Sequence, residues 1–182
     1  MTRTALWIAA GVVLGLIVHL VIMLMLPALS PKDVWQKIPG IETANTITLL
    51  DPVTPGSPNP LALDPLFSYA ICRIDLSRGP GEVVGDLPNT FWSVAVYARD
   101  GRVVYSTTNR SGTSGTLELG VFNSEQTQLL ARQEIPVEEG LLIVQSPVDD
   151  IFALIRLAAP YPVVRARYRD ILSALTCRNI GS

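Results

Sequence analysis

The sequence predicts a mainly β protein of the α+β class, with one N-terminal transmembrane helix, a Pro-rich stalk and an antiparallel β-sandwich-like domain that ends in helices. Three observations predict this arrangement. Residues 5–26 are apolar and carry no charged side chain, residues 27–65 are rich in proline, and most of the remainder alternates apolar and polar residues between turn signals. A run of strands followed by helices is typical of the α+β class.

The run ALWIAAGVVLGLIVHLVIMLML at residues 5–26 predicts a helix that spans a membrane. At about 1.5 Å per residue, such a helix covers the roughly 30 Å hydrocarbon core of a bilayer. Trp7 stands near one end of the run and Trp35 lies beyond the other, and indoles favour the membrane interface. The run is longer than the apolar part of a signal peptide and lacks a small-x-small site at its end. We therefore expect an uncleaved signal anchor, with cleavage as the alternative.

The charges around this run do not fix its orientation. Arg3 precedes it, while Lys32 and Lys37 follow it, so the positive-inside rule is close to a tie. The two cysteines favour an oxidising compartment, where an even number can pair. We expect residues 1–4 to form a cytoplasmic tail and the main domain to be exported.

Residues 27–65 are expected to form a connector between the helix and the domain. Its prolines are Pro27, Pro31, Pro39, Pro52, Pro55, Pro58, Pro60 and Pro65. Each proline fixes its own φ and favours an extended conformation in the residue before it. The connector is therefore predicted to be a semi-rigid spacer, or a strap along the domain surface, with one short strand at residues 47–50.

The domain, residues 66–182, is predicted to begin with strands, because alternating apolar and polar residues are bounded by turn signals. Strands are expected at residues 67–76, 82–85, 90–99, 102–108, 116–122, 128–135 and 140–145, the last of them buried. Asp100 and Gly101 separate two of these strands, and this dipeptide suits a type I′ hairpin turn, in which both central residues have positive φ.

Two helices are expected to follow the strands. Ser146, Pro147 and Asp149 match a capping box with proline at the first helical position, which predicts a helix over residues 148–159. A second helix is predicted over residues 163–177. Its apolar face would hold Val164, Tyr168, Ile171, Leu172 and Leu175. Arg165 and Arg169 are then expected on the solvent side.

Cys72 is expected in the middle of a strand and Cys177 at the end of the last helix. A disulfide between them would join that helix to the sheet and close a long loop. The alternative is two buried free thiols.

Gly11 and Gly15 form a GxxxG motif in the apolar run, and His19 lies four residues further on. Small residues at this spacing let two membrane helices approach closely, although glycine is also common in membrane helices in general. An ionisable residue at membrane depth is a candidate for function, as a proton relay or a bond to a neighbouring helix. The simpler alternative is a neutral imidazole with one hydrogen bond within a helix pair.

We expect no catalytic, cofactor-binding or metal-binding residues. His19 is the only histidine, which removes the usual histidine-dependent catalysis and metal sites from the domain. The chain after Arg3 carries 13 basic and 16 acidic residues, which gives it a net charge of −3. A nucleic-acid-binding protein needs a basic surface, so this charge does not indicate nucleic-acid binding. Facing carboxylates drawn from Asp75, Asp86 and Asp100 stay open as an alternative. The neighbouring pairs Glu138-Glu139 and Asp149-Asp150 are expected at the surface, the second as helix caps.

Three segments carry a resemblance to a known family: LFSYAICRIDLSRGP, FWSVAVYARDGRVVYSTTNRSG and GLLIVQSPVDD. Over roughly residues 62–177 the chain resembles an uncharacterised bacterial family, domain of unknown function twelve fifty-four, in its short, membrane-anchored alphaproteobacterial form. The resemblance implies a β-rich domain facing the periplasm and a companion membrane protein of a related unknown-function family. Longer members fuse the two domains, whereas this chain resembles the first of them and has an anchor that the fused proteins lack.

These observations together predict a single-pass protein of the bacterial inner membrane with its main domain in the periplasm. We expect a non-catalytic binding or assembly subunit of an envelope complex, which contacts the lipid bilayer and forms a homo- or hetero-oligomer through its membrane helix. Two alternatives stay open: a periplasmic enzyme that acts on a cell-wall or lipid-linked substrate through carboxylates, and a sensor that binds a small apolar ligand between the sheets.

Overall fold

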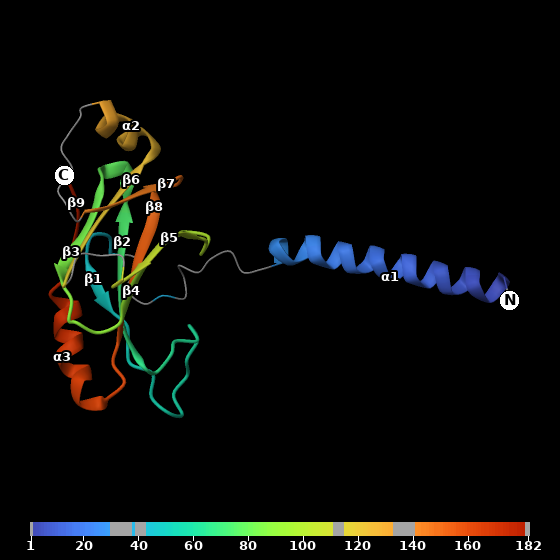
Figure 1. Ribbon diagram of the computed structural model, residues 1–182, viewed down its shortest axis with the longest axis horizontal. Helices are drawn as coiled ribbons and strands as arrows, with labels where there is room; N and C mark the ends of the chain where they lie inside the picture. Colours follow the sequence, from blue (N-terminus) through green and yellow to red (C-terminus); the bar gives the residue numbers. More distant parts are fainter. Residues whose placement is uncertain (1, 30–37, 39–42, 111–114, 133–140, 181–182) are drawn as a thin grey trace. The chain divides into compact units, whose positions relative to one another are not determined.

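The computed structural model describes residues 2–29, 38, 43–110, 115–132 and 141–180. The chain divides into two units, Met1–Lys32 and Asp33–Ser182, which are considered separately below. Figure 1 shows the helix of the first unit and the strands of the second.

The first unit contains helix α1, Thr2–Leu29. Within its stretch Thr2–Leu26, an 18-residue window reaches a mean hydropathy of 2.7, and none of this window is buried in the structure. The predicted apolar helix is therefore confirmed, and by length and composition it can span a membrane.

The second unit is a sandwich of two sheets. The first sheet has the order β1 (Ile47–Leu49), β2 (Phe67–Asp75), β8 (Asp150–Ala158), β4 (Trp92–Ala98) and β5 (Val103–Thr108). The second has the order β7 (Leu142–Ser146), β6 (Thr116–Asn123), β3 (Gly81–Asp86) and β9 (Thr176–Asn179). All paired strands are antiparallel except β6 and β7, which are parallel. The mainly β, α+β fold is confirmed.

Three helical segments connect the strands. A 3-10 turn, η2 (Leu76–Arg78), follows β2, helix α2 (Ser124–Arg132) follows β6, and helix α3 (Pro162–Ser173) follows β8. Figure 1 shows α2 at one end of the sandwich and the beginning of α3 near the other.

The main core lies between the two sheets. In β8, the alternate residues Ile151, Ala153, Ile155 and Leu157 are fully buried. They pack in one cluster with residues of the second sheet such as Leu119. This burial at every second position is the pattern of a strand with one face on a core. The strand is central in its sheet because it pairs with β2 on one side and β4 on the other.

The structure corrects both the predicted helix over residues 148–159 and the predicted strand over residues 128–135. The first region is β8, so the expected C-terminal helical pair is a single helix, α3, followed by the strand β9. The second region is helical as far as Arg132, where the described residues stop until residue 141. Asn123 and Gln126 begin α2 with a capping box, because each side chain accepts a bond from the other's backbone amide at 2.9 Å.

The β4–β5 hairpin is present, but its turn is not type I′. The Gly101 amide donates to the Ala98 carbonyl, and the Ala98 amide donates to the Arg102 carbonyl, both at 2.9 Å. Gly101 has φ +81°, whereas Asp100 is not among the described non-glycine residues with positive φ. The hairpin therefore closes with three residues and a glycine bulge, the next most common solution after the two-residue turns.

The predicted connector is largely part of the domain. Within it, β1 pairs with β2, and Leu50 and Ile38 are buried, so ordered packing begins well before residue 66. Residues 30–37 and 39–42 of the predicted connector lie outside the described residues. The strand expected to be buried at 140–145 is also corrected, because β7 is an edge strand and Ile143 is exposed.

Candidate interaction surfaces

The first candidate surface is a face of α1 that carries Gly11, Gly15 and His19, called the glycine face below. These residues are four positions apart, so they follow one side of the helix. A Cβ atom built on Gly11 or on Gly15 would meet no atom within 4 Å. The glycine face can therefore admit the backbone of another helix, and the His19 imidazole can donate or accept a hydrogen bond beside it.

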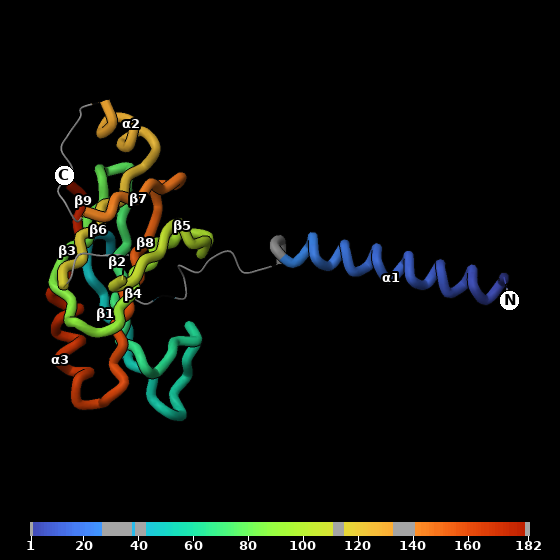
Figure 2. Tube along the Cα trace, in the orientation of Figure 1, coloured from blue at the N-terminus to red at the C-terminus, as the bar shows by residue number. Residues whose placement is uncertain are grey.

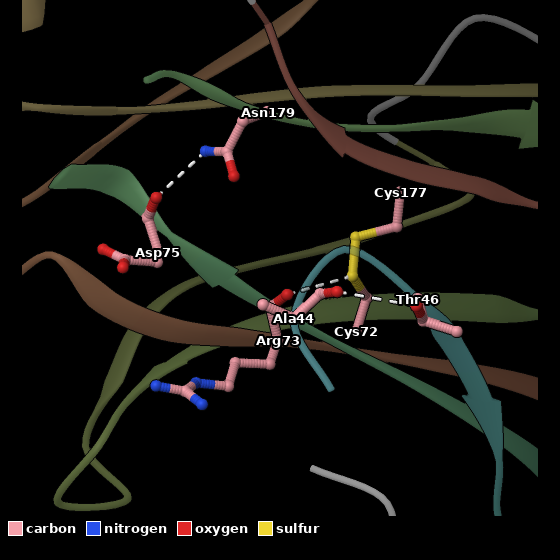
Figure 3. Close-up of a disulfide and its surroundings, with 7 residues drawn as sticks. All are labelled: Ala44, Thr46, Cys72, Arg73, Asp75, Cys177 and Asn179. Carbon is pink, nitrogen blue, oxygen red and sulfur yellow. Dashed lines mark hydrogen bonds between the residues drawn. A yellow bond between two sulfur atoms is a disulfide. The ribbon is translucent and has the colours of Figure 1, made fainter. Parts of the chain in front are cut away.

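The second predicted pair, Cys72 and Cys177, is joined by a disulfide with a Cα–Cα distance of 6.5 Å (Figure 3). Cys177 lies in β9 and not at a helix end, so the bond joins the two sheets and does not attach a helix to one sheet. Next to the bond, the Asn179 side-chain amide donates to the carbonyls of Asp75 (3.0 Å) and Gly79 (2.6 Å). The disulfide and these hydrogen bonds together fix β9 against the first sheet.

The outer face of the first sheet, away from the main core, carries a second apolar cluster. Its buried members are Ile38, Leu50, Tyr69, Ile71 and Phe152. Leu61 and Leu63 pack against them, and the rings of Tyr97 and Phe152 stack with centroids 5.0 Å apart. The connector therefore covers part of this face, as the strap alternative predicted.

Two arginines of α3 fix the ends of the loop formed by residues 51–64. Arg169 donates to the Leu50 carbonyl at 3.1 Å, and Arg165 donates to the Pro65 carbonyl at 3.0 Å. Both arginines were predicted to face solvent, and the structure corrects this: they are partly buried and hold the chain on either side of the loop. Figure 2 shows this loop leaving β1 and returning to β2.

A pocket of about 390 Å³ lies within this loop. Leu50, Leu61, Leu63 and three prolines supply apolar wall, while Asp51, Thr54, Ser57 and Asn59 supply polar groups. Its size and mostly apolar lining suit a small apolar molecule.

The three carboxylates considered for catalysis each have a local partner. Asp75 accepts bonds from the Ser77 hydroxyl (2.6 Å) and amide (3.0 Å), and the hydroxyl bond is the main reason that the pKa of Asp75 is lowered. Asp86 accepts from the Thr116 hydroxyl, and Asp100 from the Arg102 amide. A carboxyl with a lowered pKa is poorly suited to donate a proton at neutral pH.

The Asp149-Asp150 pair does not cap a helix, which corrects the prediction. Asp149 accepts a bond from the Asn123 side chain at 2.9 Å, and Asp150 pairs with Arg73 at 3.0 Å and Arg99 at 3.6 Å. Asp149 also lines a polar pocket of about 420 Å³ beside α2. Glu138 and Glu139 lie outside the described residues. In the part of the chain that the structure describes, no group of three His, Cys, Asp or Glu residues could hold a metal ion.

Sequence reasoning found the glycine face and the cysteine pair but missed the arginine contacts with the loop. The acceptors of Arg165 and Arg169 are main-chain carbonyls 100 and 119 residues away, and a carbonyl leaves no mark in a sequence. The sequence contains a Pro-rich segment and, about 100 residues later, an Arg-rich helix, but neither feature specifies this contact.

No family model and no curated protein matches the chain. Among solved structures, the chain is similar to the VPA0106 protein from Vibrio parahaemolyticus, with a TM-score of 0.54 and 8% identity over 65% of this chain and 29% of that protein. An uncharacterized protein from Burkholderia cenocepacia aligns with a TM-score of 0.43 and 14% identity over 66% of this chain and 32% of that one. The chain therefore matches less than a third of either protein, and the likeness to the Vibrio protein is one of fold alone.

Proposed function

We propose that this protein is a non-catalytic binding or assembly subunit of a bacterial envelope complex, anchored in the inner membrane by α1 with its β domain in the periplasm. Its partner is a companion membrane protein, which it meets through the glycine face. The resemblance to domain of unknown function twelve fifty-four belongs to this proposal, since members of that family are accompanied by such a protein.

The observation that carries the proposal is the glycine face on a helix whose described side chains are all exposed. Gly11 and Gly15 remove the side chains that would keep another backbone away. His19 is the only ionisable side chain between Arg3 and Lys32. A polar group at membrane depth is costly unless it is hydrogen-bonded, and a neighbouring helix can supply the partner.

The periplasmic side is supported by the disulfide between Cys72 and Cys177. Disulfides persist in oxidising compartments such as the bacterial periplasm and are rare in the cytosol. With the domain outside, residues 1–4 at the start of the chain lie on the cytoplasmic side.

The test is co-purification of the tagged full chain from its native membranes in mild detergent. Replacing Gly11 and Gly15 by leucine should release the companion, because leucine side chains hold the helices apart. Val13→Leu with Ile17→Leu is the matched control, since these positions have the same spacing on the other side of α1. If the companion co-purifies with the glycine variant as well as with the control variant, α1 is only an anchor.

The pocket within loop 51–64 favours a second candidate function, the binding of a small apolar ligand. The same purification separates the two candidates. A stoichiometric membrane protein supports the assembly subunit, whereas a chain that emerges alone with a bound apolar compound supports the ligand binder.

A further inference from the structure

Four large apolar side chains are exposed at one end of the sandwich: Leu66 by 52%, Phe91 by 44%, Tyr161 by 67% and Val163 by 84%. They are called the end patch below. Leu66 precedes β2, Phe91 precedes β4, and Tyr161 and Val163 lie where β8 gives way to α3.

Main-chain hydrogen bonds bring these segments together. The Ala159 amide donates to the Leu66 carbonyl at 2.7 Å, and the Ala158 amide donates to the Phe91 carbonyl at 2.9 Å. Because β8 lies between β2 and β4, Leu66 and Phe91 flank its end on either side. Leu66 is opposite Ala159 and Phe91 is opposite Ala158, so the two residues lie on opposite faces at the end of the sheet, and the patch surrounds this end.

The remaining exposed large apolar side chains of the described domain are scattered. They are Val103, Leu129, Ile143 and Ile180, on β5, α2, β7 and the residue after β9. Single exposed apolar residues are normal on a protein surface, whereas a group of them marks an interaction site. The end patch is therefore the distinctive apolar surface of the described domain.

We propose that the end patch rests on the surface of the lipid bilayer in which α1 is anchored, an inference that depends on the membrane-anchor part of the proposed function. The amphipathic ring of Tyr161 favours the interfacial region, and Phe91 adds apolar surface beside it. Helix α3, which begins at the patch, carries the exposed Arg167 and the partly buried Arg165 and Arg169, which bond to loop carbonyls, against one acidic residue, Asp170. This positive charge complements anionic headgroups.

The length of the chain supports lipid as the occupant. Residues 30–37 separate Leu29, the last residue of α1, from Ile38, which is buried on the outer face of the first sheet. Nine consecutive Cα–Cα steps span at most about 30 Å. A domain tied this closely to a bilayer meets a high local concentration of lipid, so even a small apolar patch suffices for contact.

The test places a fluorescent reporter in the patch of the full chain. Trp7 and Trp35 are first replaced by phenylalanine, and Trp92 is kept because it is only 2% exposed. Tyr161→Trp and, as a second reporter, Val163→Trp are compared with Leu129→Trp, a control on α2 that is 55% exposed. Each chain is reconstituted into vesicles of phosphatidylcholine and phosphatidylglycerol that contain a brominated phosphatidylcholine.

Bromine quenches tryptophan only at close range, so the two patch reporters should lose several-fold more emission than the α2 control and shift to the blue. Vesicle flotation of the same samples measures the anchor separately. If the chains float and the patch reporters are quenched no more than the control, this inference is overturned and the anchor stands. If the chains do not float, the anchor and this inference both fail.

Discussion

The Tyr69 hydroxyl accepts a hydrogen bond from the Asp64 amide at 2.9 Å, at the point where loop 51–64 returns to the sheet. Tyr69 is buried among the apolar residues of the outer face of the first sheet. Burial raises the pKa of Tyr69 above its ordinary value of 10.0, because the phenolate would lose its hydration. One side chain thus anchors the loop and makes the fold sensitive to alkali.

Replacing Tyr69 by phenylalanine keeps the ring and removes the hydroxyl. We expect a loss of about 1 kcal/mol in the free energy of unfolding at neutral pH, since the Asp64 amide loses its acceptor. In the parent, the stability contributed by protonated Tyr69 should fall as the pH rises from 10.0 through the raised pKa of the folded state. Over this range Tyr69 loses its proton in the unfolded chain first, which favours unfolding.

Denaturant titrations of both proteins between neutral pH and pH 11 measure this difference. The gap in stability between parent and Tyr69→Phe should narrow over the alkaline range. A constant gap would mean that the hydroxyl does not titrate differently in the folded and unfolded states.

At the scale of single elements, the regions that sequence reasoning assigned wrongly show which physical effect decided them. The segment DIFALIRLA in β8 carries apolar residues compatible with both helical and strand periods, and the capping-box pattern before it favoured a helix. Pairing with β2 on one side and β4 on the other made it a strand. Tertiary contacts thus overruled a local signal.

Helix α2 is the opposite case, because a local signal was present and was missed. Asn123 followed three residues later by Gln126 is a capping pattern, and both side chains make the reciprocal bonds. The strands β2, β4, β5 and β6 were predicted correctly, because their β-branched and aromatic residues between turn signals are local features of a strand.

The contact between α3 and the loop leads to a prediction at this scale. Arg169→Gln should free the Leu50 carbonyl and expose loop 51–64 to protease, because the loop then loses one of its two arginine contacts. Arg167→Gln is the control, an exposed arginine two positions away on the same helix. Limited proteolysis followed by mass spectrometry locates the cut, and equal cleavage of both variants would argue against the contact.

At the scale of the whole molecule, the disulfide joins the two sheets through residues 105 positions apart. Closing a loop of this length restricts the unfolded chain, and removing such a bond from a small exported domain costs about 2–5 kcal/mol. The double variant Cys72→Ala with Cys177→Ala should therefore unfold at a clearly lower denaturant concentration. The parent should fall to the same midpoint in reductant, while the variant should not respond to reductant at all.

The fold class followed from the sequence because alternation, turns and the apolar run are local properties. The strand order did not follow, since nothing local states that β8 lies between β2 and β4. The same limit applies to the candidate surfaces. The glycine face lies within one helix and was visible, whereas the end patch combines residues from 66 to 163 and appears only when strands far apart in sequence pair.

The central place of β8 also constrains how the domain can fold. The strands on either side of it, β2 and β4, are complete by residue 98, but β8 begins only at Asp150. During synthesis from the N-terminus, residues 99–149 are made while β2 and β4 each keep one pairing edge open. Such long-range pairing slows folding, and open strand edges promote aggregation. Until β8 has been made, the partly synthesised domain therefore exposes the strand edges that favour aggregation.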